Sequence, residues 1–255
     1  MPTANRLHLA AGALLVGSAT AAASAVPILW VCDGAGRIGR IDVETGGVLS
    51  IVETGIGLTD IAFSPEGDLY GIDFSSLHAI DPDTGASSNV GGHGIGLGNA
   101  LAFGFDGTLY AAGAGGGGLH ALDRATGASR LIGDMGFASA GDLTFNGDGF
   151  YMSSSGGDLV SIDPFTAEAE AIGPLGLANP WGLATAENGI TYAVAGTAIH
   201  AVDLETGATT FLSDFGGQGI GAATGSSFVA IPGPGAPACL ALAAGLGGVG
   251  RRRRG

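Results

Sequence analysis

The 255-residue sequence contains no lysine and only two cysteines, and only 13% of its residues are charged. Cys32 and Cys239 are too few for a disulfide framework or a cysteine-based metal site, and Cys32 is predicted to be a small buried residue. All 23 acidic residues lie in the central body, whereas five of the nine arginines lie in the two ends, which leaves the body with a charge of about −19. A body this acidic repels phosphate backbones, which excludes nucleic acid as a partner.

The sequence also lacks a sustained helical period in its central body. Glycine accounts for 50 residues, but no Gly-X-Y repeat is present that would indicate a fibrous chain. Valine, isoleucine, leucine and phenylalanine are instead spaced regularly, which indicates a buried core. Short apolar runs separated by turn residues predict an all-β fold.

The N-terminal end reads as a secretory signal peptide. Arg6 precedes an apolar run from Leu7 to Val16, and small residues lead to Ala23-Ser24-Ala25. This order of a positive charge, an apolar segment and an A-x-A site predicts export and cleavage after Ala25. The alternative is that these residues form an N-terminal core helix. The apolar run is too short to span a membrane by itself.

The C-terminal end, residues 232–255, combines a Pro/Gly linker, a short apolar segment and a cluster of arginines. Its marker residues are Pro232, Pro234, Arg251, Arg252, Arg253 and Arg254. The segment resembles the PEP-CTERM sorting tail of bacterial exported proteins, although Gly233 stands where that family has glutamate. The resemblance implies transient contact of the tail with the inner membrane, with the arginines on the cytoplasmic side. It also implies processing by exosortase-type sorting machinery and a final place outside the cell or at the cell surface. A disordered basic tail is the alternative.

A repeat with a period of about forty residues fills the chain between these ends. Aspartate followed by a turn ending in Thr-Gly or Thr-Ala recurs from Asp42 to Asp203, with steps of 39, 42, 40 and 40 residues. A second anchor runs from Asp60-Ile61-Ala62-Phe63 to Gly221-Ala222-Ala223-Thr224, and a third is an aromatic residue, beginning at Trp30 and ending at Phe228. Three anchors that keep one period indicate repeated structural units.

Each unit predicts four short antiparallel strands. Residues 60–63, 69–72, 77–80 and 87–90 illustrate the order, with Pro65 and Gly67 marking one turn and Gly85 another. Repeated four-stranded units are typical of a β-propeller, and the anchors resemble those of NHL-like and quinoprotein-like propellers over residues 28–231. We therefore predict a propeller in residues 26–231, with five blades.

The two ends of the propeller predict how the ring closes. The first unit lacks its innermost strand, and residues 220–224 are expected to supply it, leaving residues 226–231 as a spare or outer extension. The N- and C-terminal strands then share one blade, so that no strand edge is left open. A six-bladed ring with one incomplete blade is the alternative.

The residues that lead into the innermost strands are the candidates for a binding site at one mouth of the central channel. They are Thr59, Asp60, Asn99, Asp142, Asn179, Trp181 and Gln218. Oxygen ligands converging from several blades are able to hold Ca²⁺, and Trp181 is suited to grip a sugar. The alternative is that these polar side chains only solvate the mouth and cap strand ends. The aspartates of the repeated turns are expected to accept hydrogen bonds from turn amides rather than to bind calcium.

These features favour an exported, non-enzymatic propeller that is sorted to the cell surface or extracellular matrix and binds a glycan or protein ligand, with no cofactor. The competing hypothesis is a metal-dependent propeller hydrolase or lactonase with its site at the channel mouth. No local Ser-His-Asp or Cys-His pattern and no P-loop or dinucleotide motif accompanies the repeats.

The signal peptide generates a direct test. When the full chain is produced in an exporting bacterium, N-terminal sequencing of the protein outside the cytoplasm is expected to begin at Val26, because cleavage follows Ala25. An Ala23→Arg and Ala25→Arg double variant should accumulate uncleaved, because large charged residues do not fit the A-x-A site. A mature protein that begins at Met1 would contradict the prediction.

Overall fold

The computed structural model describes residues 26–147 and 149–229, in which twenty β-strands form five four-stranded antiparallel sheets. In order from the inner to the outer strand, the first sheet contains β20 (Ala223–Ser227), β1 (Ile28–Asp33), β2 (Arg37–Asp42) and β3 (Val48–Glu53). The second contains β4 (Asp60–Phe63), β5 (Leu69–Ile72), β6 (Ser76–Ile80) and β7 (Ser87–Gly92). The third contains β8 (Gly98–Phe103), β9 (Leu109–Gly113), β10 (Gly116–Leu122) and β11 (Ser129–Asp134). The fourth contains β12 (Ser139–Asn146), β13 (Gly149–Ser154), β14 (Asp158–Ile162) and β15 (Ala169–Pro174). The fifth contains β16 (Pro180–Thr185), β17 (Thr191–Ala195), β18 (Ala198–Val202) and β19 (Thr209–Asp214).

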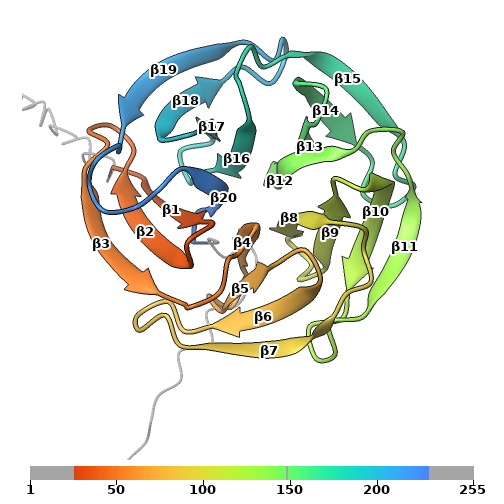
Figure 1. The fold of residues 1–255 in the computed structure, drawn as a ribbon. Helices are drawn as coiled ribbons and strands as arrows, with labels where there is room; N and C mark the ends of the chain where they lie inside the picture. The colour runs from red at the N-terminus through yellow and green to blue at the C-terminus, as the bar shows by residue number, and fades with distance from the viewer. Residues whose placement is uncertain (1–25, 148, 230–255) are drawn as a thin grey trace, which may run out of the picture.

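The five sheets stand around a common axis as the blades of a propeller (Figure 1). The inner strands β20, β4, β8, β12 and β16 surround the axis, and the outer strands β3, β7, β11, β15 and β19 form the rim (Figure 1). The prediction of an all-β, five-bladed propeller is confirmed, and the six-bladed alternative is wrong. Within these described residues no helix has the length and hydropathy that a membrane span needs. The predicted signal peptide, residues 1–25, and the predicted tail, residues 232–255, lie outside the described residues.

The ring closes where the last strand joins the first blade. β20 pairs antiparallel with β1, placing Ser227 opposite Trp30. The predicted shared blade is therefore confirmed, but the strand predicted at residues 220–224 is wrong, because the inner strand is Ala223–Ser227.

The shifted register has a physical cause in the hydrogen bonds of the inner strands. The N–H of Ser226 donates to Asp142 Oδ2, just as the N–H of Leu183 does from the neighbouring blade. Gly225 therefore occupies the place that Asp60 and Asp142 hold in their blades, and Gly225–Phe228 is the true copy of the inner-strand repeat. Phe228, expected in a spare or outer extension of residues 226–231, instead directly follows the inner strand.

The link that precedes β20 is fixed to the first blade by a charged contact. Arg37 donates from Nε and Nη2 to Asp33 Oδ2 at 2.9 and 2.7 Å, and its Nη1 donates to the carbonyl of Gly219 at 2.7 Å. The N–H of Gly221 donates to the same Asp33 oxygen at 2.8 Å. Burial by itself would raise the pKa of Asp33, but these donors hold it below its usual range. Gly221 thus anchors the approach to β20 instead of belonging to it.

The repeated aspartate turns connect the two outer strands of each blade. Asp42, Asp81, Asp123 and Asp163 each accept, through Oδ1, the N–H groups two and three residues later. The predicted hydrogen-bonding role of these aspartates is confirmed. In the first, second, third and fifth blades the residue that ends the turn is a glycine with positive φ. In the fourth blade this residue is Ala167, which adopts a φ of 64°. At Gly85 an added Cβ would meet the carbonyl of Glu53 on the preceding blade, so the turn also packs between blades.

The hydrophobic core consists of five clusters, one between each pair of neighbouring blades. Along β1, for example, Leu29 and Val31 pack against the fifth blade, whereas Trp30 and Cys32 pack against the second. Successive side chains of a strand point to opposite faces, so each blade contributes to two clusters. The prediction that Cys32 is a small buried residue is confirmed, and its thiol lies 3.4 Å from the hydroxyl of Thr224. Burial raises the pKa of this thiol to about 12, which keeps it protonated.

A pair of aromatic rings bridges four of the five blade interfaces. Each pair joins the second strand of one blade to the end of the inner strand of the next: Trp30 with Phe63, Tyr70 with Phe103, Tyr110 with Phe145, and Tyr192 with Phe228, at centroid separations of 5.1 to 5.6 Å. Such tilted and edge-to-face pairs add to the stability that apolar burial gives. At the remaining interface Thr185 takes the inner-strand place, where it follows Ala184 at the end of β16.

The inner-strand register generates a stability test at Gly225. A Cβ at this position would overlap the Asp60 carboxylate, so Gly225→Ala is expected to lower the free energy of unfolding by about 1–3 kcal/mol. Urea unfolding followed by circular dichroism measures the change. Gly116→Ala is the matched control, because Gly116 is an exposed strand residue with no atom within 4 Å of an added Cβ, and about 0.5 kcal/mol or less is expected there. Equal effects of the two substitutions would contradict the register.

Candidate functional site

Two aspartates, Asp60 and Asp142, lie on the inner strands and are fully buried. Their carboxyl groups are hydrogen-bonded to each other. The corresponding residues of the other three blades are Ala100, Gly182 and Gly225. Small residues at these three places leave room for the two carboxyl groups, because a Cβ at Gly225 would overlap Asp60. The aspartates predicted at the channel mouth are thus enclosed within the channel.

The carboxylate oxygens connect all five blades. Asp60 accepts from the N–H of Ile61 at 2.7 Å and from that of Leu101, in the third blade, at 2.6 Å. Asp142 accepts from the N–H of Leu143 in its own blade and from that of Leu183 in the fifth blade, both at 2.7 Å. Ser226, in the first blade, donates its N–H and its hydroxyl to Asp142 Oδ2 at 3.1 and 3.0 Å. Since Asp60 also bonds to Asp142, the pair bridges every inner strand.

The two carboxyl groups share protons rather than both being ionised. Burial raises the pKa of Asp60 well above its usual range, and the charge of Asp142 raises it further. Burial likewise raises the pKa of Asp142, but four hydrogen bonds and the contact with Asp60 partly oppose this. Asp142 accepts the larger number of hydrogen bonds, so its carboxylate form is the better stabilised of the two, and the titration belongs to the pair.

The mouth at which the inner strands begin, here named the strand-start mouth, is held together by hydrogen bonds between blades. Thr224 Oγ1 donates to the carbonyl of Leu58 at 2.8 Å, and Thr59 Oγ1 donates to that of Gly98 at 2.9 Å. Asn99 Nδ2 donates to the carbonyl of Ser139 at 3.4 Å. The hydroxyls of Thr224 and Thr59 and the Nδ2 group of Asn99 thus join neighbouring inner strands.

The other three residues predicted at this mouth, Asn179, Trp181 and Gln218, lie in different parts of the structure. Asn179 precedes β16 with a φ of 56°, and its carbonyl accepts from the N–H of Trp181 at 2.9 Å. Trp181 is 37% exposed, and its backbone lies against Gly141. Gln218 lies on the periphery, where its amide bonds to the carbonyl of Gly46 at 2.8 Å and to the N–H of Val48 at 3.0 Å. The expectation that Gln218 leads into an inner strand depended on the wrong register for β20. The structure therefore brings Asp60 and Asp142 together, and it places Gln218 apart from them.

A cluster on the second blade near this mouth engages Asp73, in the loop after β5. His78 Nε2 lies 2.9 Å from Asp73 Oδ2, and Ser75 donates both its N–H and its hydroxyl to Asp73 Oδ1. Burial alone would raise the pKa of Asp73, but the hydrogen bonds from His78 and Ser75 lower it to about 2. The aspartate therefore stays ionised and fixes the loop after β5.

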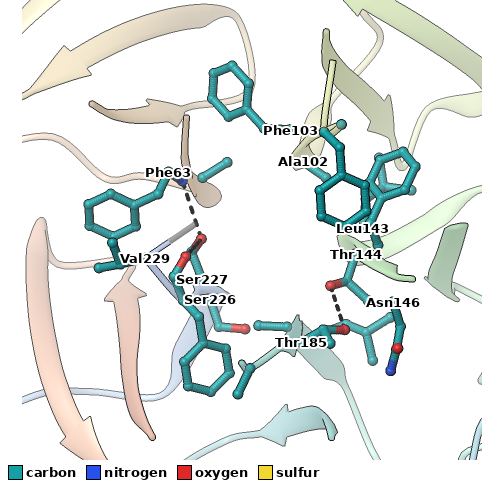
Figure 2. A pocket seen from close by; sticks show the side chains of 18 of the residues that line it. Phe63, Ala102, Phe103, Leu143, Thr144, Asn146, Thr185, Ser226, Ser227 and Val229 are labelled. Carbon is teal, nitrogen blue, oxygen red and sulfur yellow. Dashed lines mark hydrogen bonds between the residues drawn. The ribbon is translucent and has the colours of Figure 1, made fainter. Parts of the chain in front are cut away.

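A pocket of about 380 Å³ opens at the opposite mouth, where the inner strands end, here named the strand-end mouth. Its wall carries the phenyl rings of Phe63, Phe103, Phe105, Phe145 and Phe228. Figure 2 shows the side chains of the inner strands surrounding an open centre, with Phe63 and Phe103 on different blades. Phe105 is 65% exposed and lies 6.1 Å from Phe145, ring centre to ring centre, at the outer edge of this wall.

Small and polar residues line the rest of the pocket. Ala62, Ala102 and Ala184 leave it open, and Ser226 connects its inner part to the buried Asp142. Thr144 and Thr185 hydroxyls are 3.1 Å apart, and the Ser227 hydroxyl lies 3.3 Å from the N–H of Phe63 (Figure 2). An apolar cavity with a few fixed polar groups is the usual form of a site for an apolar ligand or side chain.

Sequence reasoning missed this pocket because it placed the site at the start of the inner strands. A signal was nevertheless present. Three of the inner-strand repeats end in phenylalanine, at Phe63, Phe103 and Phe145, and this places apolar rings next to the turns that follow. Phe228 was hidden by the register error at β20.

No group of three or more histidine, cysteine, aspartate or glutamate residues within residues 26–147 and 149–229 gathers in a way that could hold a metal ion. The carboxylate oxygens of Asp60 and Asp142, which were the strongest candidates for calcium, all accept hydrogen bonds from the inner strands.

Comparison with known protein families places residues 34–170, more than half of the chain, in the family described as outer membrane protein assembly factor BamB. A search of curated proteins found no match.

Several solved structures match this chain at low sequence identity. A chain in the nidogen/laminin complex superposes with a TM-score of 0.60 at 11% identity, covering 80% of this chain and 99% of that one. A protein of unknown function from Bacteroides caccae gives a TM-score of 0.48 at 15% identity, covering 72% of each chain. Hydrazine synthase of Kuenenia stuttgartiensis gives a TM-score of 0.46 at 19% identity, covering 60% of this chain and 48% of that one. At these identities the first of the three supports the fold alone.

The aspartate pair generates a test of stability against pH. Because the folded pKa values exceed the unfolded value of about 3.9, the folded protein binds more protons than the unfolded chain above that pH. The contribution of this pair to the free energy of unfolding is therefore expected to be largest near pH 4. It should fall as the pH rises toward the folded pKa values. Asp60→Asn resembles the protonated form and should reduce this slope, although it weakens one backbone hydrogen bond at a cost of about 1–3 kcal/mol. Urea unfolding from pH 4 to 9 measures both effects.

Asp73 provides the contrasting control for that experiment. Its pKa is lowered to about 2, so its contribution is present above the unfolded pKa and is lost as the pH falls toward 2. Asp73→Asn should therefore leave the slope between pH 4 and 9 in place. A wild-type protein whose stability rises steadily with pH in that range, with no difference in Asp60→Asn, would contradict the shared-proton pair.

Proposed function

The chain belongs to the family of the outer membrane protein assembly factor BamB, and from this premise we propose that it is an exported β-propeller that serves as a non-enzymatic binding module of the cell envelope or cell surface. The family description supports a place in the envelope, and the predicted signal peptide agrees with it. The predicted PEP-CTERM-like tail extends the proposal to sorting by exosortase-type machinery, with transient contact with the inner membrane.

The observation that carries the binding function is the pocket at the strand-end mouth. Five phenylalanine rings line a cavity of about 380 Å³, and one of them, Phe105, is mostly exposed. Exposed apolar surface that is concave and supported by a rigid scaffold is typical of a ligand or partner site. The inner strands on which it is built are fixed to one another by the aspartate pair, so the site is preorganised.

The geometry of the acidic groups favours binding over hydrolysis. A metal-dependent lactonase requires carboxylates that are open to a metal and to water at a mouth of the channel. Asp60 and Asp142 are instead fully buried and engaged by N–H groups from all five blades and by the Ser226 hydroxyl. Their arrangement supports a role in holding the inner strands, and leaves the pocket as the place for a ligand.

Binding of a neutral apolar dye tests the pocket. Nile red is expected to bind the full chain at one site with enhanced fluorescence, because the phenylalanine wall excludes water from it. Phe105→Ala should weaken the binding about three- to tenfold, since the ring contributes exposed apolar area at the edge of the wall. Phe165→Ala is the matched control, because Phe165 is 81% exposed in the turn between β14 and β15 and does not line the pocket.

Two outcomes would contradict the proposal. Equal loss of dye binding in both phenylalanine variants would remove the pocket as the site. Calcium-dependent hydrolysis of a lactone by the full chain, lost in an Asp60→Asn variant that remains folded, would instead establish an enzyme.

A further inference from the structure

Acidic side chains lie in three of the turns at the strand-end mouth, beside the phenylalanine-lined pocket. Glu66 and Asp68 lie in the turn after β4, Asp106 lies in the turn after β8, and Glu187, in the turn after β16, lines the pocket itself. Within the described residues, the salt bridges at this rim include Glu66 but neither Asp106 nor Glu187. The mouth therefore combines apolar rings with unneutralised negative charge.

Arg124 shows how this mouth holds a cation. Its guanidinium carbon lies 5.7 Å from the centre of the Phe103 ring, and its Nη1 lies 3.1 Å from Glu66 Oε2. The guanidinium is thus placed between an aromatic face and a carboxylate, an arrangement that favours cations through both cation–π and charge–charge attraction. Phe105 and the adjacent Asp106 bring the same two chemical groups to the neighbouring part of the rim.

We propose that the pocket binds a basic, apolar peptide segment of a partner protein: an apolar side chain enters between the phenylalanine rings, and flanking arginine or lysine side chains lie on Asp106 and Glu187. This inference rests on the proposed binding function and names the chemistry of the partner. Charge complementarity carries it, because the body of the protein is strongly acidic and an acidic field attracts and orients a cationic partner.

The same charges disfavour other occupants of the site. A second copy that met this mouth with its own mouth would bring two acidic rims together, and a phosphate-rich surface would be repelled in the same way. A purely apolar ligand would fill the pocket without using the rim. The experiment below therefore distinguishes a contribution of charge from apolar filling alone.

The test measures binding of two hexapeptides to the full chain by titration calorimetry at low salt. One has the sequence Arg-Arg-Phe-Leu-Arg-Arg, and the other has glutamine in place of each arginine. The cationic peptide is expected to bind at least tenfold more tightly than the neutral one, and this difference should shrink in 0.5 M salt, because salt screens exposed charges. Nile red should be displaced by the cationic peptide, which places it in the pocket.

Charge-neutralising variants locate the contact. Asp106→Asn with Glu187→Gln is expected to weaken the binding of the cationic peptide about fivefold to tenfold. Glu53→Gln with Glu170→Gln is the matched control, because it removes the same charge from exposed positions on the outer strands β3 and β15, and less than a twofold effect is expected.

The outcomes separate this inference from the function on which it rests. If both peptides bind equally, or if the two double variants weaken binding equally, the basic partner is wrong while Nile red binding still supports an apolar site. If Nile red fails to bind as well, the proposed binding function itself is wrong. Thermal unfolding of each variant at the start of each titration confirms that the compared proteins are folded.

Discussion

The contact between Asp60 and Asp142 at the axis is the constraint on which the arrangement of the blades depends. A propeller brings five separate sheets to one centre, where their inner strands present backbone N–H groups to one another. Here two carboxyl groups accept those groups from all five blades, and three small residues make the space for them. An unpaired charge at such a depth would be strongly destabilising, so the shared proton between the two aspartates is part of the structure.

The two ends of the channel differ on either side of the aspartate pair. At the strand-start mouth, threonine and asparagine side chains donate to carbonyls of the next blade and draw the inner strands together. At the strand-end mouth, phenylalanine rings occupy the ends of the inner strands, and alanines beneath them leave a cavity. The rings belong to the aromatic pairs that bridge neighbouring blades, so the same residues that stabilise the interfaces also form the wall of the candidate site.

Ring closure depends on the register of one short strand. β20 has weak strand character in sequence, since Ala223–Ser227 consists only of small residues. It is held there by its pairing with β1, by the bonds from Ser226 to Asp142, and by the tie between Arg37, Asp33 and the preceding link. Contacts made by residues almost 200 positions apart thus decide where the last strand begins. This also explains why the repeat pattern along the sequence placed the strand three residues too early.

The amino-acid sequence by itself determined the class of fold, the number of blades and the shared terminal blade, because the turn aspartates, the alternating apolar residues and the aromatic anchors are local features that recur every forty residues. It also indicated that the turn aspartates serve their own turns, since their partners lie two and three residues away. The tertiary structure alone decided that Asp60 and Asp142 meet on the axis, that Gln218 binds a hairpin at the periphery, and that phenylalanines of four blades line one mouth. These relations join different blades, and the direction in which a side chain points across the ring follows from closure and packing, which no local pattern encodes.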